Sequence, residues 1–167
     1  MRLAVLSDIH DQTDNLRALL TALKFWQVEA LILCGDITRP HTLGLCRLPG
    51  ARLHYCLGNC DQAHAQDLLA AGPPLGAQGY ADLGRLALPQ DRGVAFCHFP
   101  AQATQVAQSG LYSAVFYGHS HRPALSRLSL SQGDVVLANP GDVQGRYGRV
   151  SALIYDSADG SHAWVDA

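Results

Sequence analysis

Carboxylate, imidazole and amide side chains that could bind metal ions follow the apolar runs of this 167-residue sequence. The set comprises Asp8, His10, Asp36, Asn59, His98, His119 and His121. Because ligands of open α/β sheets bind beyond the carboxyl ends of the strands, we expect these side chains to meet at one edge of a sheet. Imidazole combined with carboxylate favours Mn, Fe, Ni or Zn over Ca or Mg, which prefer oxygen ligands.

The local spacing of these residues also indicates a shared site. Asp8 and His10 are two residues apart, as are His119 and His121, so on extended backbone each pair would project to one side. Other candidates follow a glycine, which permits a tight turn close to an ion; these glycines are Gly35, Gly58 and Gly118. The set is too large for one tetrahedral zinc but suits two ions that share a carboxylate. Two such ions could clamp a phosphate and generate an attacking hydroxide.

Apolar runs predict the strands that must position these side chains. The runs cover residues 3–6, 30–33, 53–57, 83–88, 93–97 and 114–117. A turn is expected at 89–92, between two of these strands. From residue 125 onward the pattern is typical of hairpins. Their strands would be 125–130 with 135–138, and 150–155 with the final strand.

Helices are predicted between several of the strands. Leucines at helical spacing predict a helix over 16–23 with Thr13 or Asp14 as its N-cap. Further helices are expected over 63–71 and 100–109, and the stretch 72–79, rich in proline and glycine, should be a surface loop. The order of elements predicts an α/β fold with a mixed sheet, or two sheets packed face to face with helices outside.

Composition restricts the class of protein. Hydrophobic residues make up 48% and charged residues 16% of the sequence, which predicts one folded domain over 1–167 and excludes disorder and coiled coil. A formal net charge of −2 disfavours binding to long nucleic acid. No apolar run approaches the roughly 18 residues of a membrane span, and no signal-peptide pattern is evident. Five cysteines, an odd number, predict free thiols in the cytoplasm.

The motifs resemble those of the calcineurin-like metallophosphoesterase superfamily. They are Asp8-x-His10, Gly35-Asp36, Gly58-Asn59-Cys60-Asp61, His98, Gly118-His119-Ser120-His121 and Asn139-Pro140-Gly141. The resemblance is strongest to small single-domain bacterial and archaeal phosphodiesterases, relatives of the retromer subunit of vacuolar sorting. It implies an α/β (α+β) fold arranged as a four-layer α-β-β-α sandwich with two mixed sheets.

The resemblance also implies a role for each candidate residue. One metal would be held by Asp8, His10 and His121, a second by Asn59, His98 and His119, and Asp36 would bridge both. The implied reaction is hydrolysis of a small phosphodiester or nucleotide by a metal-bound hydroxide. Mn²⁺ is expected ahead of Fe, Ni or Zn. The catalytic residues would be His119, Asp36 and Asn59.

Two positions depart from the family pattern. Cys60 stands where many members have a histidine that protonates the leaving oxygen. Cysteine is a poorer acid at neutral pH, so we expect either that esters with acidic leaving groups are better substrates or that another residue supplies the acid. Phe99-Pro100 follows His98 where the family usually has glycine, which predicts a different loop beside the second metal.

Other interpretations remain open at this stage. The same fold could serve as a catalytically weak or inactive scaffold for protein interactions, and the same site could act as a phosphomonoesterase or nuclease. The low charge predicts exposed apolar surface and hence a possible homo-oligomer. Arg146 could bind a substrate phosphate or be a solvated arginine, and Asp11 and Asp61 could be partners of ligand histidines or turn residues. Histidines that match no motif are His41, His54, His64 and His162.

Overall fold

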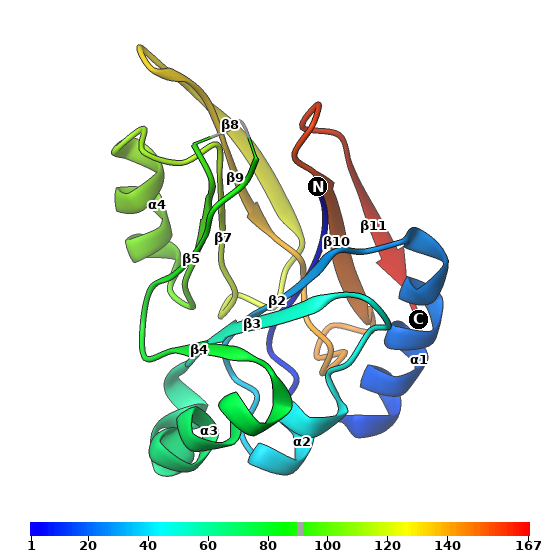
Figure 1. The fold of residues 1–167 in the computed structure, drawn as a ribbon. Coiled ribbons are helices and arrows are strands. Elements are labelled where there is room, and N and C mark those ends of the chain that lie inside the picture. The colour runs from blue at the N-terminus through cyan, green and yellow to red at the C-terminus, as the bar shows by residue number, and fades with distance from the viewer. Residues whose placement is uncertain (90–91) are drawn as a thin grey trace.

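A computed structural model describes residues 1–89 and 92–167, so the predicted turn at 89–92 lies partly outside the described residues (Figure 1). The chain forms two mixed β-sheets. The first has the strand order β11-β10-β1-β2-β3-β4. Its strands are β1 (Arg2–Leu6), β2 (Ala30–Cys34), β3 (Arg52–Cys56), β4 (Gln78–Tyr80), β10 (Ser151–Asp156) and β11 (His162–Asp166).

The second sheet has the order β5-β6-β7-β9-β8. Its strands are β5 (Gly84–Leu86), β6 (Val94–Phe96), β7 (Ala114–Phe116), β8 (Ala124–Leu130) and β9 (Gly133–Asn139). In both sheets the central strands run parallel. Leu6 pairs with Leu33, and Cys34 pairs with Cys56, so β1, β2 and β3 end in step. The end of β6 is likewise level with that of β7. The segments that leave these strands therefore begin side by side.

Helices cover the outer faces of the two sheets. The α-helices are α1 (Thr13–Leu23), α2 (Pro40–Leu45), α3 (Ala65–Ala71) and α4 (Pro100–Gln108), and the short 3₁₀ helices are η1 (Lys24–Trp26), η2 (Asn59–His64) and η3 (Pro73–Leu75). In Figure 1, α4 lies outside the second sheet, whereas α1, α2 and α3 lie on the side of the first sheet. No helix among the described residues is long and apolar enough to cross a membrane.

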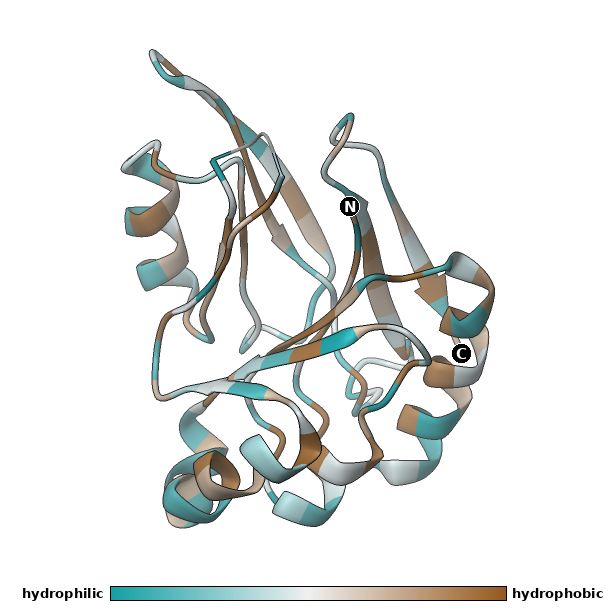
Figure 2. Cartoon of the chain, in the orientation of Figure 1, coloured by the Kyte–Doolittle hydropathy of each residue, from teal (hydrophilic) through white to brown (hydrophobic). Residues whose placement is uncertain are grey.

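Three apolar cores separate the four layers, and apolar residues recur along the strands of both sheets (Figure 2). Leu16 and Leu19 of α1 share a core with Leu33 of the first sheet. Between the sheets, Ile32 shares a core with Phe116. Burial of each such side chain contributes about 1.5–3 kcal/mol. The third core lies between α4 and the second sheet. The prediction of an α-β-β-α sandwich with two mixed sheets is therefore confirmed.

Several local predictions are corrected by the structure. Helix α1 begins at Thr13 with Gln12 as N-cap, and the side chains of Thr13 and Asp14 accept hydrogen bonds from Arg17 (3.3 and 3.0 Å). The helix expected over 63–71 is divided into η2 and α3. The supposed loop 72–79 contains η3 and the start of β4, which pairs with β3. Helix α2, which was not predicted, is only six residues long and begins at a proline.

Candidate metal centre

The turns after β1 and β2 are joined by backbone hydrogen bonds. The Asp8 N–H donates to the Gly35 carbonyl (3.1 Å), and the His10 N–H donates to the Asp36 carbonyl (3.0 Å). The side chains meet as well, because His10 Nε2 lies 3.5 Å from Asp36 Oδ2 and 3.9 Å from Asp8 Oδ1. Both carboxylates are almost completely buried. Asp8 and Asp36 thus form an acidic floor shared by the two strand ends.

One group of candidate ligands surrounds Asp8. Ligand atoms of Asp8, His10 and His121 lie within 4.8 Å of one another, and His121 Nε2 is 3.5 Å from Asp8 Oδ1. The rings of His10 and His121 stack with their centroids 5.2 Å apart. His10 Nε2 is buried without a hydrogen-bond partner among the described residues. Since an unpaired buried polar atom is costly, a cation at this point fits the donor set.

Asp142 fixes the orientation of His121. Its buried carboxylate lies 2.8 Å from His121 Nδ1 and also accepts a hydrogen bond from the Arg146 N–H (3.0 Å). A carboxylate accepts the Nδ1 proton, so the Nε2 lone pair of a neutral His121 faces Asp8. Sequence reasoning missed Asp142, although it directly follows the Asn139-Pro140-Gly141 motif. The same contact orders the backbone at Arg146, whose guanidinium lies 6.0 Å from the Tyr147 ring.

A second group of candidate ligands surrounds Asn59. Asn59 Oδ1 lies 3.0 Å from both His98 Nε2 and His119 Nδ1, and His98 Nε2 is 3.5 Å from Asp36 Oδ2. His98 Nδ1 is 2.8 Å from the Cys34 carbonyl oxygen, which can only accept, so Nδ1 carries the proton. In a neutral His98, Nε2 then carries no proton and is an acceptor. It faces Asn59 Oδ1, which is also an acceptor. Two acceptors facing each other at 3.0 Å suit a cation between them.

The backbone at most of the candidate ligands is strained. Residues with positive φ include Asp8 (55°), His10 (46°), Asp36 (53°), His119 (67°) and His121 (58°). The extended backbone inferred from the two-residue spacings is therefore wrong, and convergence depends on left-handed turns instead. Each such residue costs about 1–3 kcal/mol, and strain of this kind gathers at functional sites.

Glycines allow these turns to approach one another, as the sequence predicted. A Cβ on Gly35 would lie 2.6 Å from His98 Nδ1 and would therefore clash with a candidate ligand. A Cβ on Gly58 would overlap the Asp36 carboxylate, and one on Gly118 would overlap the Ser7 hydroxyl. Any larger residue at these positions would displace the floor of the site.

Asp61 and Asp11, whose roles the sequence left open, each join neighbouring turns. Asp61 is buried and accepts hydrogen bonds from the backbone N–H groups of Asp36 (2.9 Å), Thr38 (2.6 Å) and Gly58 (2.7 Å). It therefore clamps the turns after β2 and β3 rather than a histidine. Asp11 accepts from the Thr42 hydroxyl and pairs with Arg39 (3.0 Å), so it joins the β1 turn to the region of α2.

Burial dominates the electrostatics of the site. It raises the pKa of Asp8, against the hydrogen bond from Ser7 and the charges of His98 and His121, which lower it. Burial together with the nearby Asp36 carboxylate raises the pKa of Cys60 to about 11. Cys60 is also joined to the site through its backbone, which donates to Asp36 Oδ1 (2.8 Å). Its thiol therefore stays neutral, in keeping with a poor proton donor.

Phe99 occupies the position where the family pattern has glycine. Its ring centroid lies 5.0 Å from that of His98 and 5.1 Å from that of His119, in edge-on contacts. Pro100 begins α4 immediately afterwards. The departure predicted at this loop therefore adds an aromatic wall beside the second group of ligands.

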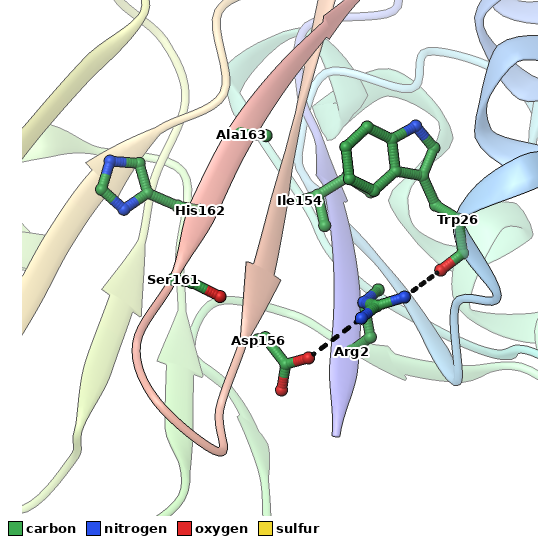
Figure 3. Close-up of a pocket in the computed structure, with 7 residues that line it drawn as sticks. All are labelled: Arg2, Trp26, Ile154, Asp156, Ser161, His162 and Ala163. Carbon is green, nitrogen blue, oxygen red and sulfur yellow. Dashed lines mark hydrogen bonds and ion pairs between the residues drawn. The ribbon is translucent and has the colours of Figure 1, made fainter.

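A separate cavity of about 180 Å³ borders β1, β10 and β11 (Figure 3). The Arg2 guanidinium donates there to the Trp26 carbonyl (2.9 Å) and to Asp156 (3.4 Å), so its charge is already paired. The groups of metal-capable side chains found in the described part of the chain all lie elsewhere, among the residues that follow β1, β2, β3, β6 and β7. This cavity is therefore distinct from the candidate metal centre.

Comparisons with known proteins show the family and support the fold. The family described as "Calcineurin-like phosphoesterase superfamily domain" matches residues 1–160. Phosphodiesterase MJ0936 of Methanocaldococcus jannaschii is 25% identical over 147 residues, covering 87% of this chain and 86% of that protein. A solved archaeal phosphodiesterase has a TM-score of 0.83 at 22% identity, with both chains fully covered. Vps29 of Entamoeba histolytica, solved with Zn²⁺, has a TM-score of 0.62 at 14% identity, covering 100% and 98% of the two chains.

Proposed function

The chain belongs to the calcineurin-like phosphoesterase superfamily, and we propose on this basis that it is a phosphodiesterase that uses two divalent metal ions on small phosphodiesters. One observation carries the proposal: two groups of candidate ligands share Asp36. Its Oδ2 lies 3.5 Å from the Nε2 atoms of both His10 and His98. The phosphodiesterase named among its relatives supports the choice of a diester.

The donor set supports a pair of transition-metal ions. Asp8, His10 and His121 would hold the first ion; Asn59, His98 and His119 would hold the second; and Asp36 would bridge them. Mn²⁺ suits these nitrogen and oxygen ligands, as do Fe, Ni and Zn. When bound, such ions neutralise the phosphate and lower the pKa of an attacking water molecule.

The chain's own residues prepare the site for this chemistry. Asp142 and the Cys34 carbonyl hold the Nδ1 protons of His121 and His98, which keeps their Nε2 lone pairs directed inward. His119 is exposed, and its backbone N–H donates to both oxygens of Asp8 (3.2 and 3.0 Å). In this position its imidazole, with Asn59, can steady the charge that develops on the phosphate. Cys60 supplies no efficient acid, so esters with good leaving groups should be the better substrates unless another group supplies the acid.

Hydrolysis of bis(p-nitrophenyl) phosphate with added Mn²⁺ tests the proposal. We expect the wild-type chain to be active, and Asp36→Ala and His119→Ala to lose at least a hundredfold in kcat/KM. His162→Ala, which changes an exposed histidine of β11, is the matched control and should keep wild-type activity. Equal activity in all four proteins would contradict the assignment. If no form hydrolysed any phosphoester and the metal-free chain still bound another protein, the scaffold interpretation would be favoured.

Three further expectations belong to this proposal. The five cysteines are all unpaired, which supports a reducing cytoplasm as the place of action. Residues 1–167 are proposed to act as one domain. A homo-oligomer stays a prediction, and size-exclusion chromatography that gives only a monomer at micromolar concentration would remove it.

A further inference from the structure

A cavity of about 320 Å³ lies beside the second group of candidate ligands. The chain reaches it from η2 and α3, from the segment between β4 and β5, and from the start of α4. Its apolar walls include Leu57, Leu69 and Phe99, and its polar lining groups are Gln62 and Asp82. This volume falls within the range of small-molecule sites.

The cavity shares walls with the proposed metal centre. Gly58, which lines it, directly precedes Asn59. Phe99, which also lines it, contacts the rings of His98 and His119. Phe99 remains 39% exposed, so part of this residue is accessible to a ligand. A phosphoester bound at Asn59 and His119 would therefore have one of its ester groups next to this cavity.

The lining defines the chemistry that the cavity would accept. No basic side chain is among the described residues that line it, and the Asp82 carboxylate repels anions. Gln102 Nε2 donates to Asp82 Oδ2 (2.8 Å), which holds the carboxylate in place while leaving it further acceptor capacity. The Phe99 ring offers a flat apolar surface, and Gln62 offers an amide. An uncharged planar group that carries N–H donors fits these features.

We propose that this cavity binds the nucleobase of a nucleotide substrate, with Phe99 against its face and Asp82 accepting from an exocyclic amino group. The inference rests on the proposed function and specifies its substrate class. A base stacked on an aromatic side chain gains roughly tenfold or more in affinity. Asp82 is exposed, so its discrimination would rest on the charge-assisted hydrogen bond that the amino group donates to its carboxylate, which is stronger than one between neutral groups.

Equilibrium binding in the presence of Mn²⁺ tests the inference without relying on turnover. The probes are AMP and ribose 5-phosphate, which share a phosphate and a ribose but differ in the base. We expect the wild-type chain to bind AMP at least tenfold more tightly than ribose 5-phosphate. Phe99→Ala should reduce that ratio about tenfold, and Phe99→Tyr should restore it. Phe25→Ala, at a distant and exposed phenylalanine, should leave the ratio unchanged.

A second comparison tests Asp82 separately. Purine riboside 5′-monophosphate differs from AMP only in lacking the exocyclic amino group, so the wild-type chain should prefer AMP, and Asp82→Asn should reduce this preference. The nucleobase site is overturned if the wild-type chain binds AMP no better than ribose 5-phosphate, or if Phe99→Ala keeps the wild-type ratio. Failure to hydrolyse bis(p-nitrophenyl) phosphate, with the binding ratios as expected, would instead contradict the proposed activity alone.

Discussion

His98 and His121 each have one imidazole nitrogen held by a buried oxygen and the other directed at a carboxylate. For His121 the oxygen belongs to Asp142, and for His98 it belongs to the Cys34 backbone. Such contacts select the tautomer and raise the basicity of a ligand histidine. The orientation of these candidate ligands thus depends on residues outside the candidate ligand set.

Asp142→Asn tests this dependence. A neutral amide oxygen accepts the Nδ1 proton more weakly than a carboxylate does, so we expect Mn²⁺ affinity to fall about 10- to 100-fold with the fold unchanged. Calorimetric titration with Mn²⁺ would measure the change. Asp134→Asn, at an exposed position on β9, is the matched control and should bind Mn²⁺ as the wild type does. Unchanged affinity in Asp142→Asn would show that His121 is oriented by other contacts.

Cys60→His tests the argument about the leaving group. A histidine at this position supplies an acid with a pKa nearer to neutral, whereas the Cys60 thiol has a pKa of about 11. We expect kcat/KM for alkyl diesters, which have poor leaving groups, to rise at least tenfold, with a smaller change for p-nitrophenyl esters. The ratio of the two rates is the measurement. An equal change for both kinds of ester would mean that the leaving group is protonated by another group.

At the scale of residues, the types of the candidate residues were predictable from the sequence. Their backbone conformation was not. Asp8 and His10 attract attention as acid and imidazole after an apolar run, whatever turn they occupy. Their left-handed conformation depends on contacts with the turn after β2, which is distant in sequence. Asp142 was missed for the same reason, since its partner His121 belongs to another strand end.

At the scale of elements, parallel strands that end in step bring the site together. The apolar runs predicted β1, β2, β3, β6 and β7, because strands that are buried on both faces, such as β2, β6 and β7, are continuously hydrophobic. Helix α2 and strand β4 were missed. Both are short, and β4 contains Gly79, so their stability comes from packing and from pairing with β3 rather than from local preference.

His54 on β3 predicts a pH dependence of stability. Both ring nitrogens are buried without a hydrogen-bond partner among the described residues, and burial together with Arg52 lowers the pKa of His54 in the folded chain. The unfolded chain therefore takes up a proton near pH 6.5 that the folded chain resists. Folding stability due to this group is present above about pH 6.5 and is lost as the pH falls toward the lower folded pKa.

The measurement is urea unfolding in EDTA at pH 7.5 and pH 5.5. We expect His54→Phe to lose less of its free energy of unfolding between these pH values than the wild type does. Both proteins retain the other histidines and carboxylates, so the difference isolates position 54. Parallel losses in the two proteins would contradict the prediction.

At the scale of the whole molecule, negative charge is concentrated at the candidate metal centre. The formal net charge of −2 includes Asp8 and Asp36, both buried at the strand ends. Two divalent ions would more than neutralise these carboxylates, so the loaded site would attract a phosphate although the chain has few basic residues. The cavity at Phe99 has an acidic and apolar lining, which would separate the uncharged part of a substrate from its phosphate.

The most direct test of the two-metal account is activity measured against the number of Mn²⁺ ions bound per chain. Metal-free protein would be titrated with Mn²⁺, with bound metal and bis(p-nitrophenyl) phosphate hydrolysis followed in the same samples. The account predicts two ions per chain, with activity appearing as the second site fills, and no activity in Asp36→Ala at any Mn²⁺ occupancy. Full activity in the metal-free protein, or in Asp36→Ala, would contradict it.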